Sequence, residues 1–191
     1  MNAARLEAFT DGVVAIIITI MVLEIRVPHG SDLAALQADL PVFSAYVLSY
    51  VNVGIFWNNH HHMLHVTERV NGKVLWANLA LLFWLSLVPF VIRWIDETGF
   101  TALPTAAYGV VLLCAAVSYQ ILQQQLIAYN GRDSRLAAAV GNDFKGKLSL
   151  ILYLAAIVLA FVRPWMAITL YVAVALLWLV PDRRIESLVR K

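Results

Sequence analysis

The sequence is poor in charge and in cysteine, and both shortages restrict the kind of protein it encodes. Charged residues make up 14% of its 191 residues, whereas soluble domains average about 25%. With 61% hydrophobic residues, a water-soluble globule of this size has too little polar surface to cover its core. The one cysteine, Cys114, has no partner for an internal disulfide. The composition therefore excludes a soluble enzyme and a disulfide scaffold, and it indicates an integral membrane protein.

Motifs for catalysis are missing as well. The sequence has no Ser-His-Asp set, no glycine loop that would cradle a phosphate and no redox pair of cysteines. A net charge of +2 is too small to indicate nucleic-acid binding. We therefore expect neither enzymatic activity nor a cofactor.

Apolar segments of membrane-spanning length dominate the chain. About 20 apolar residues are needed to cross the hydrocarbon layer, and six segments approach that length: about 6–27, 40–66, 74–95, 102–129, 148–162 and 165–180. We expect residues 32–39 to form an outside loop or a short amphipathic turn, and Arg163-Pro164 to form a tight hairpin. The predicted fold is all-α, a single domain of six transmembrane helices over residues 1–191.

Basic residues predict the orientation of these helices. With six spans both termini share one side of the membrane, and 11 of the 14 Lys and Arg residues fall on that side. Because cytoplasmic loops are enriched in Lys and Arg, we expect both termini to be cytoplasmic. At the opposite end, Glu24 and Arg26 either shape the potential of a pore mouth or form an exposed ion pair.

The first segment carries a carboxylate, Asp11, about one turn inside the membrane boundary. Such a charge is costly unless it is paired, which makes it a functional candidate. At about 100° per residue, Asp11 shares a face with Ala15, Ile18 and Val22, which we expect to need protein partners. The opposite face carries Ile16, Thr19, Ile20 and Leu23.

The second segment places polar groups near its cytoplasmic end, where an antiparallel neighbour of the first segment would meet Asp11. Trp57, one of two asparagines or one of four histidines could donate to Asp11, and Arg5 could complete the network. The favoured interpretation is a structural network that fixes the first helix, because polar groups in a membrane must be satisfied internally.

A metal site is the alternative interpretation of these histidines. His61, His65 and Glu68 recur at helical spacing on one face, and imidazole is a common zinc ligand. The sequence lacks the two-His-plus-Glu helix motif of zinc proteases, so a metal site is the less favoured hypothesis; histidines that merely face the cytosol are a third.

The first segment resembles the first-helix signature of the transmembrane protein 175 family, which comprises lysosomal potassium channels and smaller prokaryotic relatives. The matching string is Arg5-x-x-x-Phe9-Thr10-Asp11-Gly12-Val13-x-Ala15-Ile16-x-Ile18-Thr19-x-x-Val22-Leu23-Glu24. The family pattern is Arg-x-x-x-Phe-Ser-Asp, and Thr10 replaces its serine while keeping the hydroxyl. No Thr-Val-Gly-Tyr-Gly filter of ordinary potassium channels occurs.

The resemblance implies a homotetramer in the cell membrane whose four first helices line one central pore. Ile16 would then form the main constriction, with Thr19, Ile20 and Leu23 further out, and potassium would pass with modest selectivity over other monovalent cations. Arg5, Phe9, Thr10 and Asp11, with Trp57 or His61, would hold the pore helix in place.

Two rival functions stay open on the sequence. A secondary transporter or metal-ion exporter would use Asp11 and the residues His60 to His65 as a proton or metal relay. A membrane scaffold without transport is the third possibility.

Overall fold

The computed structural model describes residues 3–25, 27–67, 69–131, 133–141 and 143–179. The described part of the chain folds into eight α-helices. Their bounds are α1 Ala3–Leu23, α2 Leu33–His65, α3 Gly72–Ser86, α4 Val88–Thr98, α5 Ala102–Asn130, α6 Arg135–Val140, α7 Phe144–Ala160 and α8 Pro164–Leu179. The predicted all-α fold class is confirmed.

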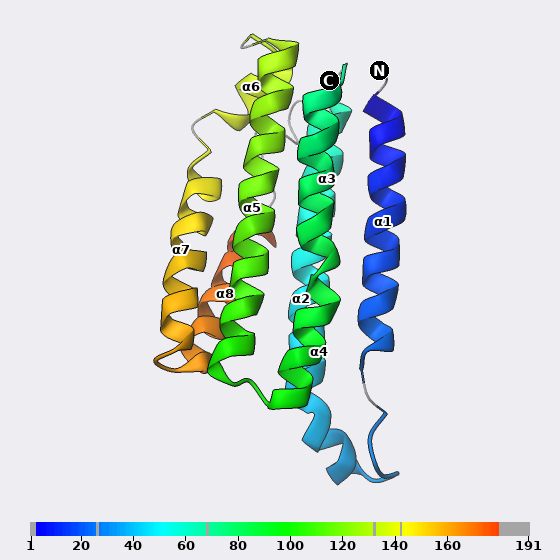
Figure 1. The fold of residues 1–191 in the computed structure, drawn as a ribbon, viewed down its shortest axis with the longest axis vertical. Helices are drawn as coiled ribbons and strands as arrows, with labels where there is room; N and C mark the ends of the chain where they lie inside the picture. Colours follow the sequence, from blue (N-terminus) through cyan, green and yellow to red (C-terminus); the bar gives the residue numbers. More distant parts are fainter. Residues whose placement is uncertain (1–2, 26, 68, 132, 142, 180–191) are drawn as a thin grey trace.

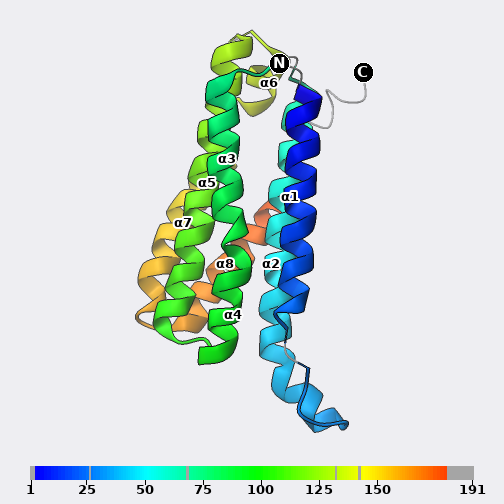
Figure 2. The ribbon, with the colours of Figure 1, turned by 45° about the vertical axis from the view of Figure 1, so that its right-hand side comes forward.

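The long helices run up and down beside one another, so that chain neighbours are antiparallel (Figure 1). α5 lies in the middle of the bundle and packs against α3, α4, α7 and α8, whereas α1 packs only at one edge, against α2, α3 and α4. Figure 2 shows α1 and α2 as a pair set beside the other helices. The first helix therefore lies at the edge of the bundle, with one side left uncovered by the described subunit.

The helical segment formed by α3 and α4 is interrupted. α3 and α4 follow the same line but are separated at Leu87, whose backbone N–H bonds back to Trp84 in a tightened turn. Pro89, near the start of α4, cannot donate the next helical hydrogen bond because proline lacks the N–H. The helical segment is thus interrupted at Leu87, two residues before Pro89.

The expected outer loop at residues 32–39 is wrong, because the helix α2 already begins at Leu33. Asp32 caps this helix by accepting a hydrogen bond from the Ala35 N–H at 2.9 Å, and alanine, leucine and glutamine then favour helix. At 1.5 Å per residue, the 33 residues of α2 extend about 50 Å. Its first turns consequently project beyond the rest of the bundle (Figure 1).

Four segments are long and apolar enough to cross a membrane: Ala3–Leu23, Leu33–His65, Gly72–Thr98 and Ala102–Asn130. The helices α7 and α8 have 17 and 16 residues in the described chain, and they form a hairpin that turns at Phe161–Arg163. The chain is therefore a multi-pass membrane protein.

The described basic residues divide unequally between the two ends of the bundle. The start of α1, the α2–α3 turn, α6 and the start of α7 lie towards one end, whereas the α4–α5 and α7–α8 turns lie at the other (Figures 1 and 2). The first end carries Arg5, Arg69, Lys73, Arg135, Lys145 and Lys147, and the second carries Arg93 and Arg163.

Candidate pore helix and its polar anchor

The helix α1 presents three different sectors around its axis. A stripe of Leu6, Thr10, Val14, Ile17 and Met21 is buried against α2, α3 and α4, with at most 7% of any of these side chains exposed. The acidic residues Glu7 and Asp11 lie at the edge of this stripe, beside α2. The remaining sector is open.

The expectation that the face of Asp11, Ala15, Ile18 and Val22 packs against protein holds only in part. Asp11, Ala15 and Val22 are exposed, whereas Ile18 is half-buried and packs against the core. The buried stripe lies about a third of a turn away from that face. It is built from aliphatic residues and one threonine, and these pack closely into the groove between α2 and α3. Asp11 lies at the edge of the stripe, where a side chain of α2 reaches it.

The open sector carries the four residues that the sequence grouped opposite Asp11. Thr19 is exposed, and the exposed fractions of Ile16, Ile20 and Leu23 are 58%, 41% and 81%. The Thr19 hydroxyl donates to the Ile16 carbonyl at 2.9 Å. The Thr19 oxygen lone pairs consequently remain free to accept, although its proton is already used.

Trp57 is the residue that reaches Asp11. Its indole N–H donates to Asp11 Oδ1 at 2.8 Å, from α2 to α1. Among the donors that the sequence left open, the structure therefore places the tryptophan on the carboxylate. Trp57 is itself 41% exposed, so this contact lies at the surface of the subunit.

A chain of buried polar groups begins at Thr10, the residue before Asp11 in α1. Asn78 Nδ2 donates to the Thr10 hydroxyl at 3.0 Å, and Asn78 Oδ1 lies 2.7 Å from His60 Nε2. All three side chains are at most 1% exposed. Because Asn78 Oδ1 can only accept, His60 carries its proton on Nε2 in this arrangement. The chain ties α1, α3 and α2 together at one depth.

His61 pairs with a residue that the sequence had not singled out as a partner. Its Nδ1 lies 2.7 Å from Glu7 Oε1, and its ring stacks between Trp57 and His65 at centroid distances of 6.2 and 6.0 Å. Glu7 thus gives α1 a second carboxylate contact with α2, one turn before Asp11.

Two of the predicted network residues lie outside this cluster. Arg5 is exposed and has no hydrogen-bond or ion-pair partner among the described residues, and Phe9 is 52% exposed. The polar contacts of α1 with α2 and α3 include Asn78, Glu7 and His60 instead. A polar residue in an apolar segment was the signal for Asn78, whereas the choice among neighbouring histidines depends on helix rotation.

The hypothesis of a metal site at His61, His65 and Glu68 gains no support from the geometry. Glu68 lies outside the described residues, and the described part of the chain contains no group of three His, Cys, Asp or Glu side chains that could hold a metal ion. His61 is already bonded to Glu7.

The opposite end of α1 is held by an ion pair. Arg93 of α4 bonds to Glu24 and to Glu97, each at 3.1 Å. Arg26, the other candidate at this end, lies outside the described residues. Beside this pair, a groove of about 410 Å³ runs between α1 and the kink, lined by Ile16, Ile20, Pro89, Phe90 and Arg93 among others.

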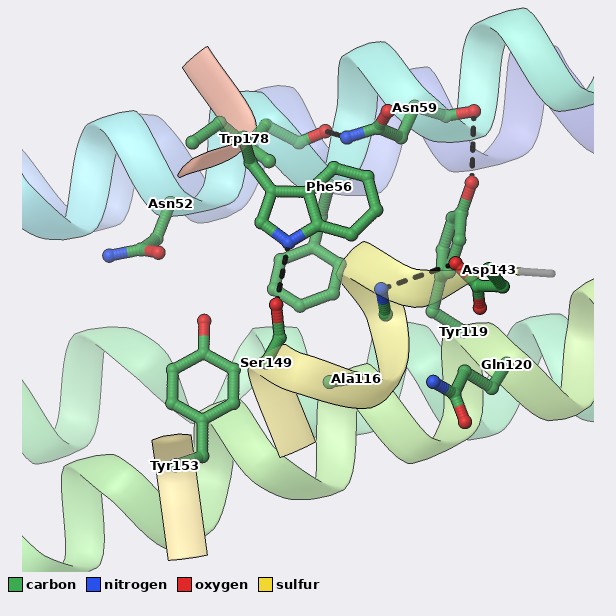
Figure 3. Close-up of a pocket in the computed structure, with 12 residues that line it drawn as sticks. Asn52, Phe56, Asn59, Ala116, Tyr119, Gln120, Asp143, Ser149, Tyr153 and Trp178 are labelled. Atoms are coloured by element: carbon green, nitrogen blue, oxygen red, sulfur yellow. Dashed lines mark hydrogen bonds between the residues drawn. The ribbon is translucent and has the colours of Figure 1, made fainter. Parts of the chain in front are cut away.

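A small cavity with several polar side chains in its lining lies inside the subunit, between α2, α5, α7 and α8 (Figure 3). Several polar groups around it bond to one another or to the backbone: Tyr119 donates to the Asn59 carbonyl at 3.2 Å, and Trp178 donates to Ser149 at 2.8 Å. Its volume of about 40 Å³ is enough for a few water molecules. This cavity does not adjoin the open sector of α1.

Fold and site together define a helical multi-pass membrane protein whose amino-terminal helix is anchored on one side by buried polar groups and left open on the other. Residues 5–89 match the sequence profile of the family described as "Endosomal/lysosomal potassium channel TMEM175". A protein of Chryseobacterium sp. (strain P1-3) that is named a potassium channel is 51% identical over 187 residues, which cover 98% of this chain and 97% of that protein. The chain belongs to the TMEM175 family of channels.

Relatives of other lengths agree with this assignment. A potassium channel of Streptomyces collinus is 34% identical over 63% of each chain. The human endosomal/lysosomal proton channel TMEM175 is 38% identical over 96 residues, which are 44% of this chain but 19% of that protein. The crystal structure of a lysosomal potassium-selective channel TMEM175 homologue from Chamaesiphon minutus superposes with a TM-score of 0.80 at 25% identity, covering 94% of this chain and 97% of that one.

Proposed function

We propose that this protein is a potassium-selective cation channel in which four copies of α1 surround a central pore. The observation that carries the proposal is the open sector of α1. A helix fixed to its own subunit by Thr10, Asp11 and Glu7 leaves Ile16 and Leu23 58% and 81% exposed. Names of the relatives support potassium as the ion.

The proposed assembly is a homotetramer with six transmembrane helices per subunit. α7 and α8 would complete the six, since they pack with the four longer spans in one bundle. Both termini would lie on the cytoplasmic side of the cell membrane, because the end of the bundle that carries the start of α1 holds most of the described basic residues.

Ile16 would form the narrowest ring of the pore. Four isoleucine side chains that meet on an axis leave no wetted path, so the ring acts as a hydrophobic gate. Opening requires a small rotation or splay of the four helices. The groove beside Ile16 and Ile20, next to the kink at Leu87, gives α1 room for such a rotation.

Thr19 would supply the oxygen ligands of the pore. Because its proton is donated to the Ile16 carbonyl, the hydroxyl presents lone pairs to an ion in the open sector. A ring of four such oxygens favours a cation that loses its water readily, as potassium does. Aliphatic rings add no ligands, so selectivity over sodium is modest.

The polar anchor would hold the pore helix and would not touch ions. The Thr10–Asn78–His60 chain is buried, and Asp11 and Glu7 face α2. Their contribution is to fix the rotation of α1 about its own axis, which decides whether Ile16 faces the pore.

Substitution of the constriction tests the proposal directly. Ile16→Asn replaces an apolar ring by one that water wets, so we expect single-channel conductance in planar bilayers to rise several-fold and the closed periods to shorten. Ile151→Asn, at a 63% exposed isoleucine of α7, is the matched control and should leave the currents unchanged. Equal currents from Ile16→Asn and the unmodified protein would refute Ile16 as the constriction.

Flux into liposomes separates a channel from the rival functions. A channel carries potassium down its gradient without a proton gradient and without saturation, whereas a transporter that uses Asp11 and His60 to His65 saturates and requires protons. A scaffold gives no flux above empty liposomes, with valinomycin as the positive control.

A further inference from the structure

A second and much larger cavity lies at the opposite end of the bundle from the polar anchor. It has a volume of about 340 Å³ and lies between the early turns of α2 and the helices α4, α5 and α8. Leu40, Leu48, Ile92 and Ile168 belong to its apolar walls. Small-molecule sites of proteins begin at about 300 Å³, so the space suits a small ligand, and α1 contributes nothing to it.

One hydroxyl in this cavity has no partner. The side chain of Thr105 is 1% exposed, and its Oγ1 makes no hydrogen bond. The neighbouring hydroxyls are all engaged: Ser44 bonds to the Leu40 carbonyl, Ser49 to the Ala45 carbonyl and to Tyr108, and Tyr171 to the Thr105 carbonyl. A buried polar group without a partner is destabilising, so Thr105 marks the place where a ligand atom would be bound.

The lining also restricts the charge of the ligand. None of the described residues that border the cavity is Asp, Glu, Lys, Arg or His, so an ionised head group would be buried without a counter-charge. A threonine hydroxyl both donates and accepts, and its complement is another hydroxyl. Apolar walls around one such group fit a neutral alcohol with a short hydrocarbon chain.

An entrance is present at the rim of the cavity. Phe100 and Trp165 stack there with ring centroids 5.1 Å apart, and Trp165 and Leu40 are 62% and 49% exposed. Phe100 adopts a left-handed backbone conformation with φ of 58°, which is strained for a residue other than glycine. The α4–α5 turn thus holds an aromatic ring over the opening.

We propose that this cavity binds a small neutral amphiphile, an alcohol whose hydroxyl pairs with Thr105 and whose chain lies between α2 and α8. The site is independent of the pore helix. Its existence therefore does not rest on the proposed channel function, and a binding measurement tests it alone.

Photolabelling with an azi-octanol, followed by peptide mass spectrometry of the whole protein in detergent, tests the proposal. We expect label on Ile168 and Val172 of α8. Excess 1-octanol should displace it at least tenfold better than octane, because octane lacks the hydroxyl. Thr105→Val should reduce this labelling at least fivefold and raise the melting temperature of the ligand-free protein, since it removes the orphan hydroxyl. Thr169→Val, an exposed threonine of α8 that lies outside the cavity, should change neither.

A second variant keeps the test decisive if Thr105→Val fails to fold. Ala45→Phe fills the cavity from α2 and should abolish the labelling. Equal competition by octane, unchanged labelling of the variants, or label spread evenly over the exposed helix faces would overturn the proposal. So would labelling that disappears in phospholipid nanodiscs, because a lipid acyl chain or a neighbouring subunit would then occupy the space.

Discussion

At the scale of single residues, the contact between Asp11 and Trp57 decides how a carboxylate is tolerated within an apolar helix. The 2.8 Å bond joins α1 to α2, and interhelical hydrogen bonds in membrane proteins contribute about 0.5–1.5 kcal/mol each. A double-mutant cycle of Asp11→Asn and Trp57→Phe, measured by reversible unfolding in mixed micelles, should therefore give a coupling energy of about that size.

A matched cycle provides the control for this measurement. Ser86→Ala removes a hydroxyl that bonds to the Phe83 carbonyl of its own helix, and its combination with Trp57→Phe should be additive. Additive effects in the Asp11 cycle as well would show that the indole does not stabilise the carboxylate.

Asn78 makes the strongest residue-scale prediction, because it serves two helices at once. Asn78→Leu would leave the buried hydroxyl of Thr10 and the ring of His60 without their partner. We expect a loss of about 1–3 kcal/mol in the free energy of unfolding. Asn59→Leu, which breaks a bond to the carbonyl of Ile55 within α2, should cost less than half as much. Equal losses would show that the interhelical bonds of Asn78 contribute no more than a hydrogen bond within one helix.

The sequence predicts some of these residues and not others, for a geometric reason. Asp11 and Trp57 could be foreseen as neighbours because antiparallel helices bring the start of one to the depth of the end of the next. The pairing of His61 with Glu7 could not, because adjacent histidines point about 100° apart and the rotation of α2 about its axis is set by packing. Arg5, expected in the network, lies on the same sector of α1 as Ile16 at about 100° per residue, and it is exposed.

At the scale of elements, α1 shows why hydrophobic periodicity locates a membrane helix but not its faces. In water the polar side of a helix marks the outside, whereas a helix in a membrane is apolar on the sides that face lipid, pore and protein alike. The buried stripe of Val14, Ile17 and Met21 is consequently no more apolar than the open sector. The carboxylate of Asp11 did not indicate the packed face, because Asp11 lies at the edge of the buried stripe.

The contact between α5 and α8 depends on a glycine. A Cβ at Gly109 would overlap the hydroxyl of Tyr171 and lie 2.8 Å from Ile157, so α5 approaches its neighbours closely only without a side chain there. Gly109→Ala should therefore destabilise the protein by about 1–3 kcal/mol, measured by thermal unfolding in detergent.

Gly12 of α1 provides the contrasting substitution. No atom of the described subunit lies within 4 Å of a Cβ at this position, and alanine is a better helix former than glycine by about 1 kcal/mol. Gly12→Ala should leave the folded subunit at least as stable as before. Destabilisation of both variants to the same degree would mean that loss of glycine, not the close approach of α5 to α8, causes the effect.

At the scale of the whole molecule, the spans are unevenly buried within one subunit. In the apolar windows of α1 and α2, 28% and 17% of the residues are buried, against 50% in the windows of α3–α4 and α5. Lipid can cover such faces. In the proposed assembly, the open sector of α1, with Thr19, would instead face the other subunits.

Disulfide crosslinking tests this assembly in the protein as it lies in the membrane. With Cys114 replaced by serine, Ile16→Cys and Leu23→Cys would place a thiol on the open sector of each α1, and thiols bridge only when their Cα atoms lie within about 7 Å. Helices that converge on a four-fold axis meet this condition.

Because each subunit then carries one cysteine, oxidation should yield covalent dimers and no larger species on a denaturing gel, while the native mass in detergent stays that of four subunits. Ile151→Cys, on the exposed face of α7, should remain monomeric on the same gel. Crosslinks from Ile151→Cys and none from Ile16→Cys would show that α7, and not α1, lies between the subunits, and the pore would then have to be sought elsewhere.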